Sequence, residues 1–97
     1  LAASHTAMTR LVLDWGDAQG VDEGTLLALI GSASGQNWLA SGFDEIEFAR
    51  DGFGDDNSIG ILAKDVGAAL DIAPDGDTAL PEAVQTAIRQ LTPRVKP

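Results

Sequence analysis

The chain has 97 residues, of which 6 are Lys or Arg and 15 are Asp or Glu, so its net charge is −9. This charge argues against non-specific binding to nucleic acid or to anionic membranes, because phosphate groups would be repelled. There is no cysteine, which excludes a disulfide frame and a thiolate metal site. No apolar run approaches the ~20 residues of a membrane span. Residues 1–97 are assigned to a single domain.

The first third of the chain predicts two helices joined by a short turn. Residues 3–19 are assigned to the first helix, and Gly20 is placed to end it in the left-handed conformation. Asp22 is expected to cap a second helix that runs to about Ser32. Apolar side chains at helical spacing define the side of the first helix that is expected to face the core. They are Met8, Leu11, Val12 and Trp15.

The next segment carries weaker signals. Ser34 is a candidate cap for a short third helix that holds Trp38 and Leu39. The apolar side chains of residues 43–53 follow no single period. We therefore expect a short helix or an extended segment that covers the core.

The second half of the chain predicts a central helix and a last helix. Residues 59–73 repeat apolar side chains at helical spacing, and one of residues 55–57 is expected to cap this helix. Pro74 is expected to end it. Pro81 suits the first position of the last helix, whose inward face reaches Leu91. The apolar stripe of the central helix consists of Ile59, Leu62, Val66, Ala69, Leu70 and Ala73.

No run alternates strictly between polar and β-branched or aromatic residues, so we expect an all-α domain. It is predicted to be a small bundle of four to five helices without an internal repeat or a linker. Residues 94–97 are expected to form a frayed tail. The chain begins at Leu1 rather than Met, which leads us to expect a fragment of a larger protein.

The sequence offers no signal for a metal site or a catalytic residue. The acidic turns at residues 51–57 and 75–77 lack the ligand spacing of an EF-hand loop and are interpreted as solvated turns and caps. His5 is the only histidine, and a lone histidine on an N-terminal helix is interpreted as a surface or core residue. There is no Gly-x-Gly-x-x-Gly run and no Walker loop. We therefore expect no metal and no catalytic residue within this chain.

Two short stretches leave a structural and a functional interpretation open. Residues 34–38, Ser-Gly-Gln-Asn-Trp, either expose backbone N–H groups to a carboxylate or phosphate, or supply only a cap and a core Trp. Lys64 is either part of a solvated helix face or a cation that reaches into a cleft. It does not form a strong ion pair with Asp65, because adjacent residues on a helix do not face each other.

Taken together, the segments resemble the C-terminal helical domain of the 3-hydroxyisobutyrate dehydrogenase family, the β-hydroxyacid dehydrogenases related to 6-phosphogluconate dehydrogenase. Four motifs occur in the order that is typical of that family, and they span roughly residues 3 to 90. They are Gly-Val-Asp at 20–22, Ser-Gly-x-x-Trp at 34–38, Ala-Lys-Asp-Val-Gly-x-Ala-Leu at 63–70 and Leu-Pro at 80–81.

This resemblance implies a role beside a separate domain. In the family, an N-terminal Rossmann domain binds NAD or NADP, while the helical domain closes the active-site cleft and forms much of the oligomer interface. The resemblance places Lys64 against the cofactor, with Asp65 orienting it or the neighbouring backbone. It places Ser34, Gly35 and Trp38 on the substrate side.

The chain departs from the family pattern at two points. The family's catalytic Lys lies in a Gly-x-x-x-Lys-x-x-Asn-Asn run that would precede Leu1, and both this run and the Rossmann domain are absent from the chain. We therefore expect the domain alone to be inactive. The family tends to place Phe eight residues before the Asp of the Lys-Asp pair, whereas this chain has Asn57. The expected whole is a cytoplasmic, homo-oligomeric oxidoreductase that acts on a small hydroxyacid-type substrate.

Two other functions remain open at this level. Residues 56–59, Asp-Asn-Ser-Ile, loosely resemble the Asp-Ser-Leu of acyl carrier proteins, which would make Ser58 the site of a prosthetic group. The alternative leaves the Lys-Asp and Ser-Gly-x-x-Trp motifs unexplained. The second alternative is a helical oligomerisation domain without any site, which would bury Lys64 in a self-contact.

Overall fold

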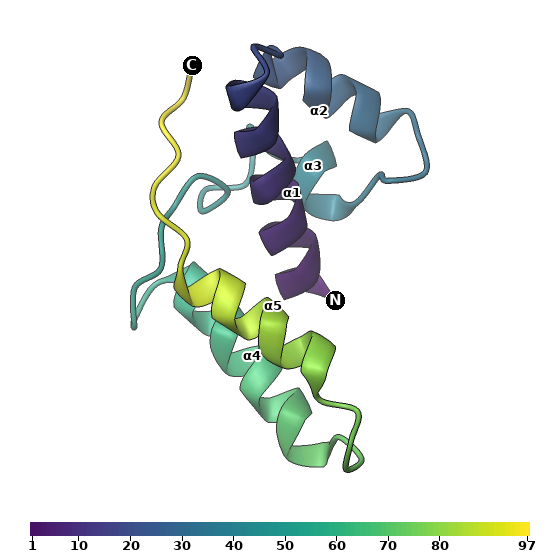
Figure 1. Cartoon of the computed structure of the whole chain (residues 1–97). Coiled ribbons are helices and arrows are strands. Elements are labelled where there is room, and N and C mark those ends of the chain that lie inside the picture. Colours follow the sequence, from purple (N-terminus) through teal and green to yellow (C-terminus); the bar gives the residue numbers. More distant parts are fainter.

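The computed structural model describes all residues from 1 to 97, and it consists of five helices without a strand (Figure 1). This architecture confirms the prediction of a small all-α bundle of four to five helices. The helices are α1 (Ala2–Ala18), α2 (Glu23–Gly31), α3 (Trp38–Ser41), α4 (Ser58–Ile72) and α5 (Ala79–Arg89).

Helix α1 is shared by two lobes of the molecule. The antiparallel α4–α5 hairpin packs against its first half, and α2 and α3 pack against its second half. Neither α2 nor α3 contacts α4 or α5. Each lobe has its own apolar core, one around Ile59 and Ile88 and the other around Leu13 and Leu39. The result is an elongated molecule of 41 × 29 × 23 Å.

Three local predictions at helix ends are confirmed. Gly20 has a φ of 74°, which is the left-handed conformation expected after α1. The Asp22 carboxylate accepts a hydrogen bond from the backbone N–H of Thr25 at 3.0 Å and so caps α2. The Asn57 side chain accepts one from the N–H of Gly60 at 2.9 Å and caps α4. These caps depend on short-range geometry, which is why sequence position alone could reveal them.

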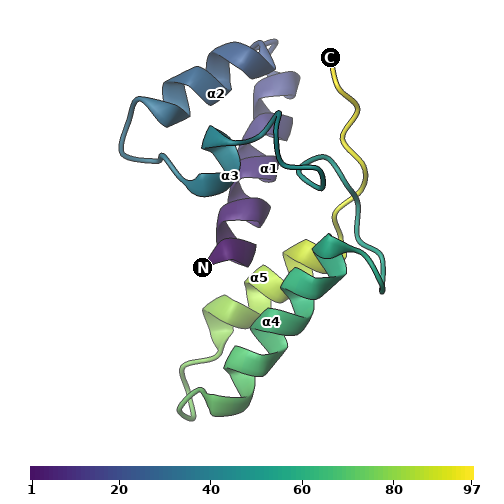
Figure 2. The same cartoon turned by 180° about the vertical axis from the view of Figure 1, so that it is seen from behind.

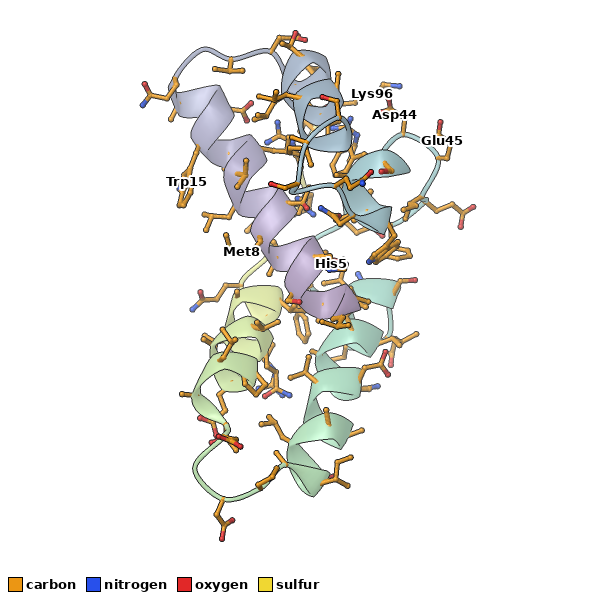
Figure 3. The ribbon with its side chains drawn as sticks, turned by 90° about the vertical axis from the view of Figure 1, so that its right-hand side faces the viewer. His5, Met8, Trp15, Asp44, Glu45 and Lys96 are labelled. Carbon is orange, nitrogen blue, oxygen red and sulfur yellow. The ribbon has the colours of Figure 1, made fainter.

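The predicted inner face of α1 is wrong. Met8, Leu11 and Trp15 are 52%, 40% and 57% exposed, and Figure 3 shows Met8 and Trp15 on the outer side of the helix. The opposite face is buried because mainly small side chains let the neighbouring segments approach, while the one long side chain finds hydrogen-bond acceptors there. The buried residues are Ala3, Thr6, Ala7, Thr9, Arg10, Leu13 and Gly16.

Two expectations for the middle of the chain are also wrong. The cap of α3 is Asn37 and not Ser34, because the Asn37 side chain accepts a hydrogen bond from the backbone N–H of Ala40 at 3.0 Å. Residues 43–50 form a series of turns rather than a helix, and residues 51–53 have no regular secondary structure. Only Phe43 and Ala49 of these residues are buried, which explains why no single period is visible.

In the α4–α5 lobe the expected stripes are largely confirmed. Ile59, Leu62 and Ile88 are buried, and Val66 is partly buried against the same core, whereas Ala69 is exposed. Helix α5 begins at Ala79, so Pro81 is its third residue rather than its first. Helix α4 ends at Ile72, just before Pro74, as predicted.

The C-terminal segment is not frayed at Arg94. Its backbone runs beside the turns after α3, where the N–H of Phe53 donates to the carbonyl of Leu91 at 2.8 Å and the N–H of Arg94 donates to that of Arg50 at 2.7 Å. Figure 2 shows this segment rising along the molecule from the end of α5. Only the last three residues fit the predicted tail, since all are exposed.

Candidate functional site

Lys64 and Asp65 lie side by side along the exposed surface of α4. Both residues are exposed, and neither takes part in any salt bridge or side-chain hydrogen bond. They project from the helix in different directions, because successive residues are about 100° apart around a helix axis. The pair is therefore a free cation beside a free carboxylate, and each is available to a separate ligand.

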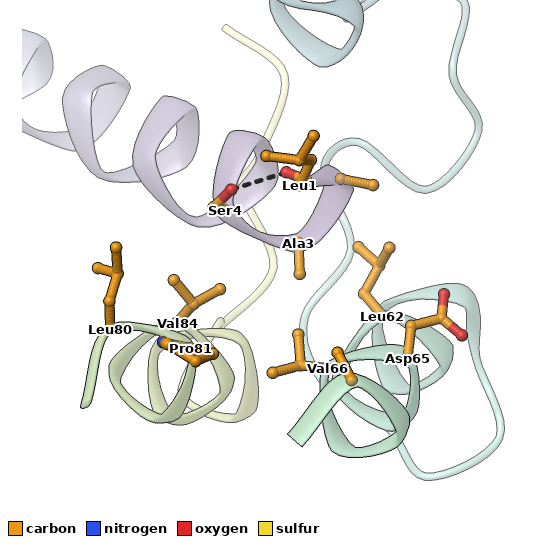
Figure 4. A pocket seen from close by; sticks show the side chains of 11 residues that line it. Leu1, Ala3, Ser4, Leu62, Asp65, Val66, Leu80, Pro81 and Val84 are labelled. Carbon is orange, nitrogen blue, oxygen red and sulfur yellow. Dashed lines mark hydrogen bonds between the residues drawn. The ribbon is translucent and has the colours of Figure 1, made fainter. Parts of the chain in front are cut away.

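Asp65 lines a cavity of about 350 Å³ between the start of α1 and the α4–α5 hairpin. We call it the N-terminal groove. Figure 4 shows Asp65 at one side and Leu80 at the other, with Val66 and Val84 between them. Eight of its eleven lining residues are hydrophobic, so it is an apolar site with few polar groups. The lining residues are Leu1, Ala2, Ala3, Ser4, Leu62, Asp65, Val66, Ala69, Leu80, Pro81 and Val84.

The predicted substrate-side residues belong to the other lobe. Ser34 and Gly35 are exposed in the loop between α2 and α3. The start of α3 offers no free anion site, since the Asn37 side chain already accepts from Ala40. α3 and α4 are not in contact, so within this domain the structure does not bring Ser34 and Gly35 together with Lys64.

Trp38 connects the two lobes indirectly. It is 38% exposed, and its ring centroid is 6.0 Å from that of Phe48 at an interplanar angle of 52°. Phe48 in turn packs against the core cluster that contains Leu62 and Ala63 of α4. Tilted aromatic pairs at this separation are favourable beyond the area they bury. Through Phe48, Trp38 therefore links α3 to the core of the α4–α5 lobe.

The strongest electrostatic feature is an ion cluster that sequence analysis missed. Glu23, at the start of α2, accepts two hydrogen bonds from Arg50 at 2.9 and 2.6 Å and one from Arg94 at 2.7 Å. Arg94 also reaches Asp14 and Asp17 of α1 at 2.8 to 3.0 Å. The partners are 27 to 80 residues apart in the chain, and no local pattern signals pairing over such separations.

These contacts fix the ionisation of the cluster. Hydrogen bonds from Arg50, and then from Arg94, hold the pKa of Glu23 below its ordinary value of 4.5, although burial opposes this. The pKa of Asp17 is likewise lowered by its hydrogen bonds to Arg94. A carboxylate that is kept ionised in this way does not take up a proton near neutral pH. In the ionised form these carboxylates bind the two arginines and so stabilise the fold.

A pH dependence is expected for Glu23. Because its pKa is depressed in the folded state, its stabilisation is complete above about pH 4.5 and is lost as the pH falls through the folded-state pKa. Glu23→Gln is expected to lower the free energy of unfolding by about 2 kcal/mol at pH 7. This loss is smaller than that for a buried ion pair whose remaining member has no other partner. The difference in free energy of unfolding between the parent protein and this variant should become smaller towards pH 2. Urea unfolding followed by tryptophan fluorescence measures it. Glu47→Gln, at an exposed unpaired position, is the matched control. A gap that stays constant with pH would contradict this assignment.

Arg10 is a buried cation that the sequence does not predict. It is 3% exposed, and its guanidinium donates to the backbone carbonyls of Ala49 at 3.0 Å, Asp51 at 2.8 Å and Thr92. Burial, which disfavours the charged form, lowers its pKa from the ordinary value of 12.5. Its Nε atom is buried without a partner. Arg10 thus joins α1 to the turns after α3 and to the segment after α5.

The remaining candidate residues do not group into a further site. His5 is half-buried and its Nδ1 atom is buried without a hydrogen-bond partner. No three His, Asp or Glu side chains gather where they could hold a metal ion. Ser58 is the first residue of α4 and is half-buried, and its role as a carrier serine stays a prediction. None of the five helices has the length and apolar character that crossing a bilayer requires.

Comparison of the chain with known protein families, curated proteins and solved structures found no match. The family resemblance therefore depends on the ordered motifs alone. Of the residues that these motifs contain, Lys64 and Asp65 are the ones that the fold leaves without partners on a helix surface.

Proposed function

We propose that this domain is the cleft-closing and oligomerising helical domain of an NAD(P)-dependent β-hydroxyacid dehydrogenase-like oxidoreductase. The observation that carries the proposal is Lys64, an exposed cation on α4 with no carboxylate partner. Arg10, Arg50 and Arg94, in contrast, donate hydrogen bonds within the fold. Lys64 lies within a long helix, which holds it in a fixed position for a contact across a cleft.

The residues present fit a single contact to NAD(P) and no more. An ammonium group on a helix rich in small residues suits the phosphate charge of a dinucleotide, but the chain has no glycine-rich phosphate loop. The nicotinamide supplies hydride chemistry when it is bound. This chain would contribute charge neutralisation at Lys64 and exclusion of water by the closing surface. Proton transfer and most of the cofactor contacts would come from the Rossmann domain and its linker.

Lys64→Ala tests this role in an enzyme that joins the domain to a Rossmann domain. Losing one charge-assisted contact to phosphate is expected to weaken NAD(P) binding about tenfold. The fold should not change, because Lys64 makes no contact that holds it. Fluorescence titration with NADH measures the affinity, and circular dichroism measures the fold. Lys96→Ala, at another exposed cation, serves as the control, and unchanged cofactor affinity in Lys64→Ala would refute the role.

A second function, self-association, is favoured by the outer face of α1. Met8, Leu11 and Trp15 lie three and four residues apart and are all at least 40% exposed. Met8 and Trp15 are labelled in Figure 3. A row of large apolar side chains on one side of a helix is typical of a surface that is covered in an assembly. It fits the oligomer interface of the proposed enzyme and equally an oligomerisation domain without a site. The behaviour of Lys64→Ala separates these two cases.

Removing the apolar face should abolish self-association. The triple change Met8→Ser, Leu11→Ser and Trp15→Ser is expected to turn an oligomer into a monomer, since a stable interface needs at least about 1,000 Å² of buried surface. Sedimentation velocity measures the mass in solution. Leu29→Ser, at a 61% exposed leucine of α2, is the control for general loss of surface hydrophobicity. A monomeric parent protein would contradict the proposed self-association.

A further inference from the structure

The chain contains two Asp-Gly bonds, Asp51–Gly52 and Asp75–Gly76, and no Asn-Gly bond. At an Asp-Gly bond the main-chain nitrogen of the glycine can attack the side-chain carboxyl carbon of the aspartate, because glycine has no Cβ atom to hinder the approach. The attack requires the peptide to rotate until these two atoms meet. Neither glycine N–H donates a hydrogen bond. What distinguishes the two bonds is therefore how firmly the surrounding backbone is held.

The backbone around Asp51–Gly52 is held by three contacts. Arg10 donates a hydrogen bond to the carbonyl of Asp51 at 2.8 Å. The Asn57 side chain donates one to the carbonyl of Gly52 at 2.9 Å. Gly52 also packs so closely against Pro93 that a Cβ atom on the glycine would lie 2.7 Å from the proline ring. Rotation at this bond would break these contacts, so the fold opposes attack by the Gly52 nitrogen.

The Asp75–Gly76 bond lies in the loop between α4 and α5, at the lower end of the molecule in Figure 1. Residues 74–77 are all exposed, and their one internal hydrogen bond runs from the N–H of Asp77 to the carbonyl of Pro74 at 3.2 Å. Gly76 has a φ of 92°, and apart from its chain neighbours nothing lies within 4 Å of the position that a Cβ atom would take. This turn favours a glycine directly after Asp75 and leaves the pair room to rotate.

We propose that Asp75 is a modification site, at which the folded protein forms isoaspartate in preference to Asp51. The nitrogen of Gly76 bonds to the side-chain carboxyl carbon of Asp75 and loses its proton, which leaves with the carboxyl OH as water, and a succinimide ring closes. Water then opens the ring at either carbonyl. Opening at the main-chain carbonyl leaves the chain linked through the side-chain carbonyl and frees the former main-chain carboxylate. Water is the only other reactant.

The product is suited to recognition by an enzyme. Isoaspartate at position 75 would present a carboxylate beside an abnormal backbone link, in a loop that is open to solvent. This fits a methyltransferase specific for isoaspartate, which transfers a methyl group from S-adenosylmethionine to that carboxylate and releases S-adenosylhomocysteine. The extra backbone carbon falls outside both helices, so the domain should stay folded. This modification goes beyond the proposed NAD(P) contact and does not depend on it.

Tryptic peptides separate the two bonds. Trypsin cuts after Arg50, Lys64 and Arg89, so the first bond falls in peptide 51–64 and the second in peptide 65–89. The folded chain is kept for weeks at neutral pH and digested, and each peptide is treated with isoaspartyl methyltransferase and tritiated S-adenosylmethionine. Peptide 65–89 is expected to take up about tenfold more methyl than peptide 51–64, because a held segment reacts only when it opens locally.

Variants and an unfolded sample assign the signal. Asp75→Glu keeps the charge but requires a larger ring that closes far more slowly, so it should abolish methylation of peptide 65–89. Asp77→Glu, in the same exposed loop, is the matched control and should leave it unchanged. When the parent chain is aged in urea, both peptides should take up similar amounts, because the fold no longer holds either bond. Circular dichroism confirms that each variant is folded.

Three results would overturn the proposal. The first is an aged, folded chain whose peptide 65–89 accepts no methyl group. The second is methylation that persists in Asp75→Glu, which would assign it to another aspartate of that peptide. The third is equal methylation of both peptides in the folded chain, which would mean that the fold does not select the site. None of these results bears on the Lys64 contact, since that contact is read from NADH affinity.

Discussion

Arg10→Met is expected to lower the free energy of unfolding by about 4 kcal/mol. The change keeps much of the side-chain length but leaves the carbonyls of Ala49, Asp51 and Thr92 without their donor. An unsatisfied buried polar group costs about 1–3 kcal/mol. The contact to Ala49 is buried and those to Asp51 and Thr92 are partly buried, and the losses are partly offset because a buried guanidinium no longer has to be desolvated. The lowered pKa of Arg10, whose main cause is burial, likewise indicates that keeping a charged guanidinium in the interior has a cost.

Urea unfolding followed by tryptophan fluorescence measures this effect. A domain of this size has a stability of about 5–15 kcal/mol, so the variant should still fold at low temperature. Arg89→Met, at the exposed end of α5, is the matched control and should change stability by less than about 0.5 kcal/mol. A loss below about 1 kcal/mol in Arg10→Met would show that the carbonyls find water instead.

Gly60→Ala is expected to destabilise the domain by about 3 kcal/mol, although alanine is normally the better helix residue. A Cβ atom at Gly60 would collide with the backbone carbonyl oxygen of Gly54 and lie 3.1 Å from that of Asp55. These atoms cannot rotate away, because Asn57 holds the loop by hydrogen bonds to Gly54 and Gly52 at 3.1 and 2.9 Å. The backbone must move to relieve this collision, so Gly60→Ala is expected to destabilise the domain.

Gly67→Ala in the same helix provides the opposite expectation. A Cβ atom there meets only the end of the Gln85 side chain, at 3.4 Å. This variant should gain about 0.5–1 kcal/mol from the higher helix propensity of alanine. Thermal unfolding by circular dichroism compares the two variants directly. Stabilisation in both would mean that the loop before α4 does not approach Gly60 as closely as the structure has it.

The local features of the fold can be predicted from the sequence, because each depends on residues that are close together in the chain. The left-handed Gly20 and the caps at Asp22 and Asn57 follow from side-chain chemistry within three residues. Sequence position assigns the third cap to Ser34 rather than Asn37, since both residue types suit the position and only the actual start of α3 distinguishes them.

Only part of the candidate site can be predicted from the sequence. The motif that contains Lys64 places it correctly on a helix, and the structure leaves it exposed. The same reasoning groups Ser34 and Gly35 with it, but these residues lie in the lobe whose helices do not contact α4. The groove beside Asp65 cannot be foreseen, because three segments that are far apart in the chain form its walls.

Composition and periodicity alone determine that this chain is acidic, all-helical and punctuated by particular glycine, asparagine and aspartate residues. Tertiary structure alone decides which side of α1 faces inward and whether the C-terminus is ordered. Hydrophobic periodicity assumes that the largest apolar side chains are buried, whereas here Arg10 occupies the interior and Trp15 the surface. Arg94 resembles part of a frayed tail in sequence because its carboxylate partners, Asp14, Asp17 and Glu23, lie more than 70 residues earlier.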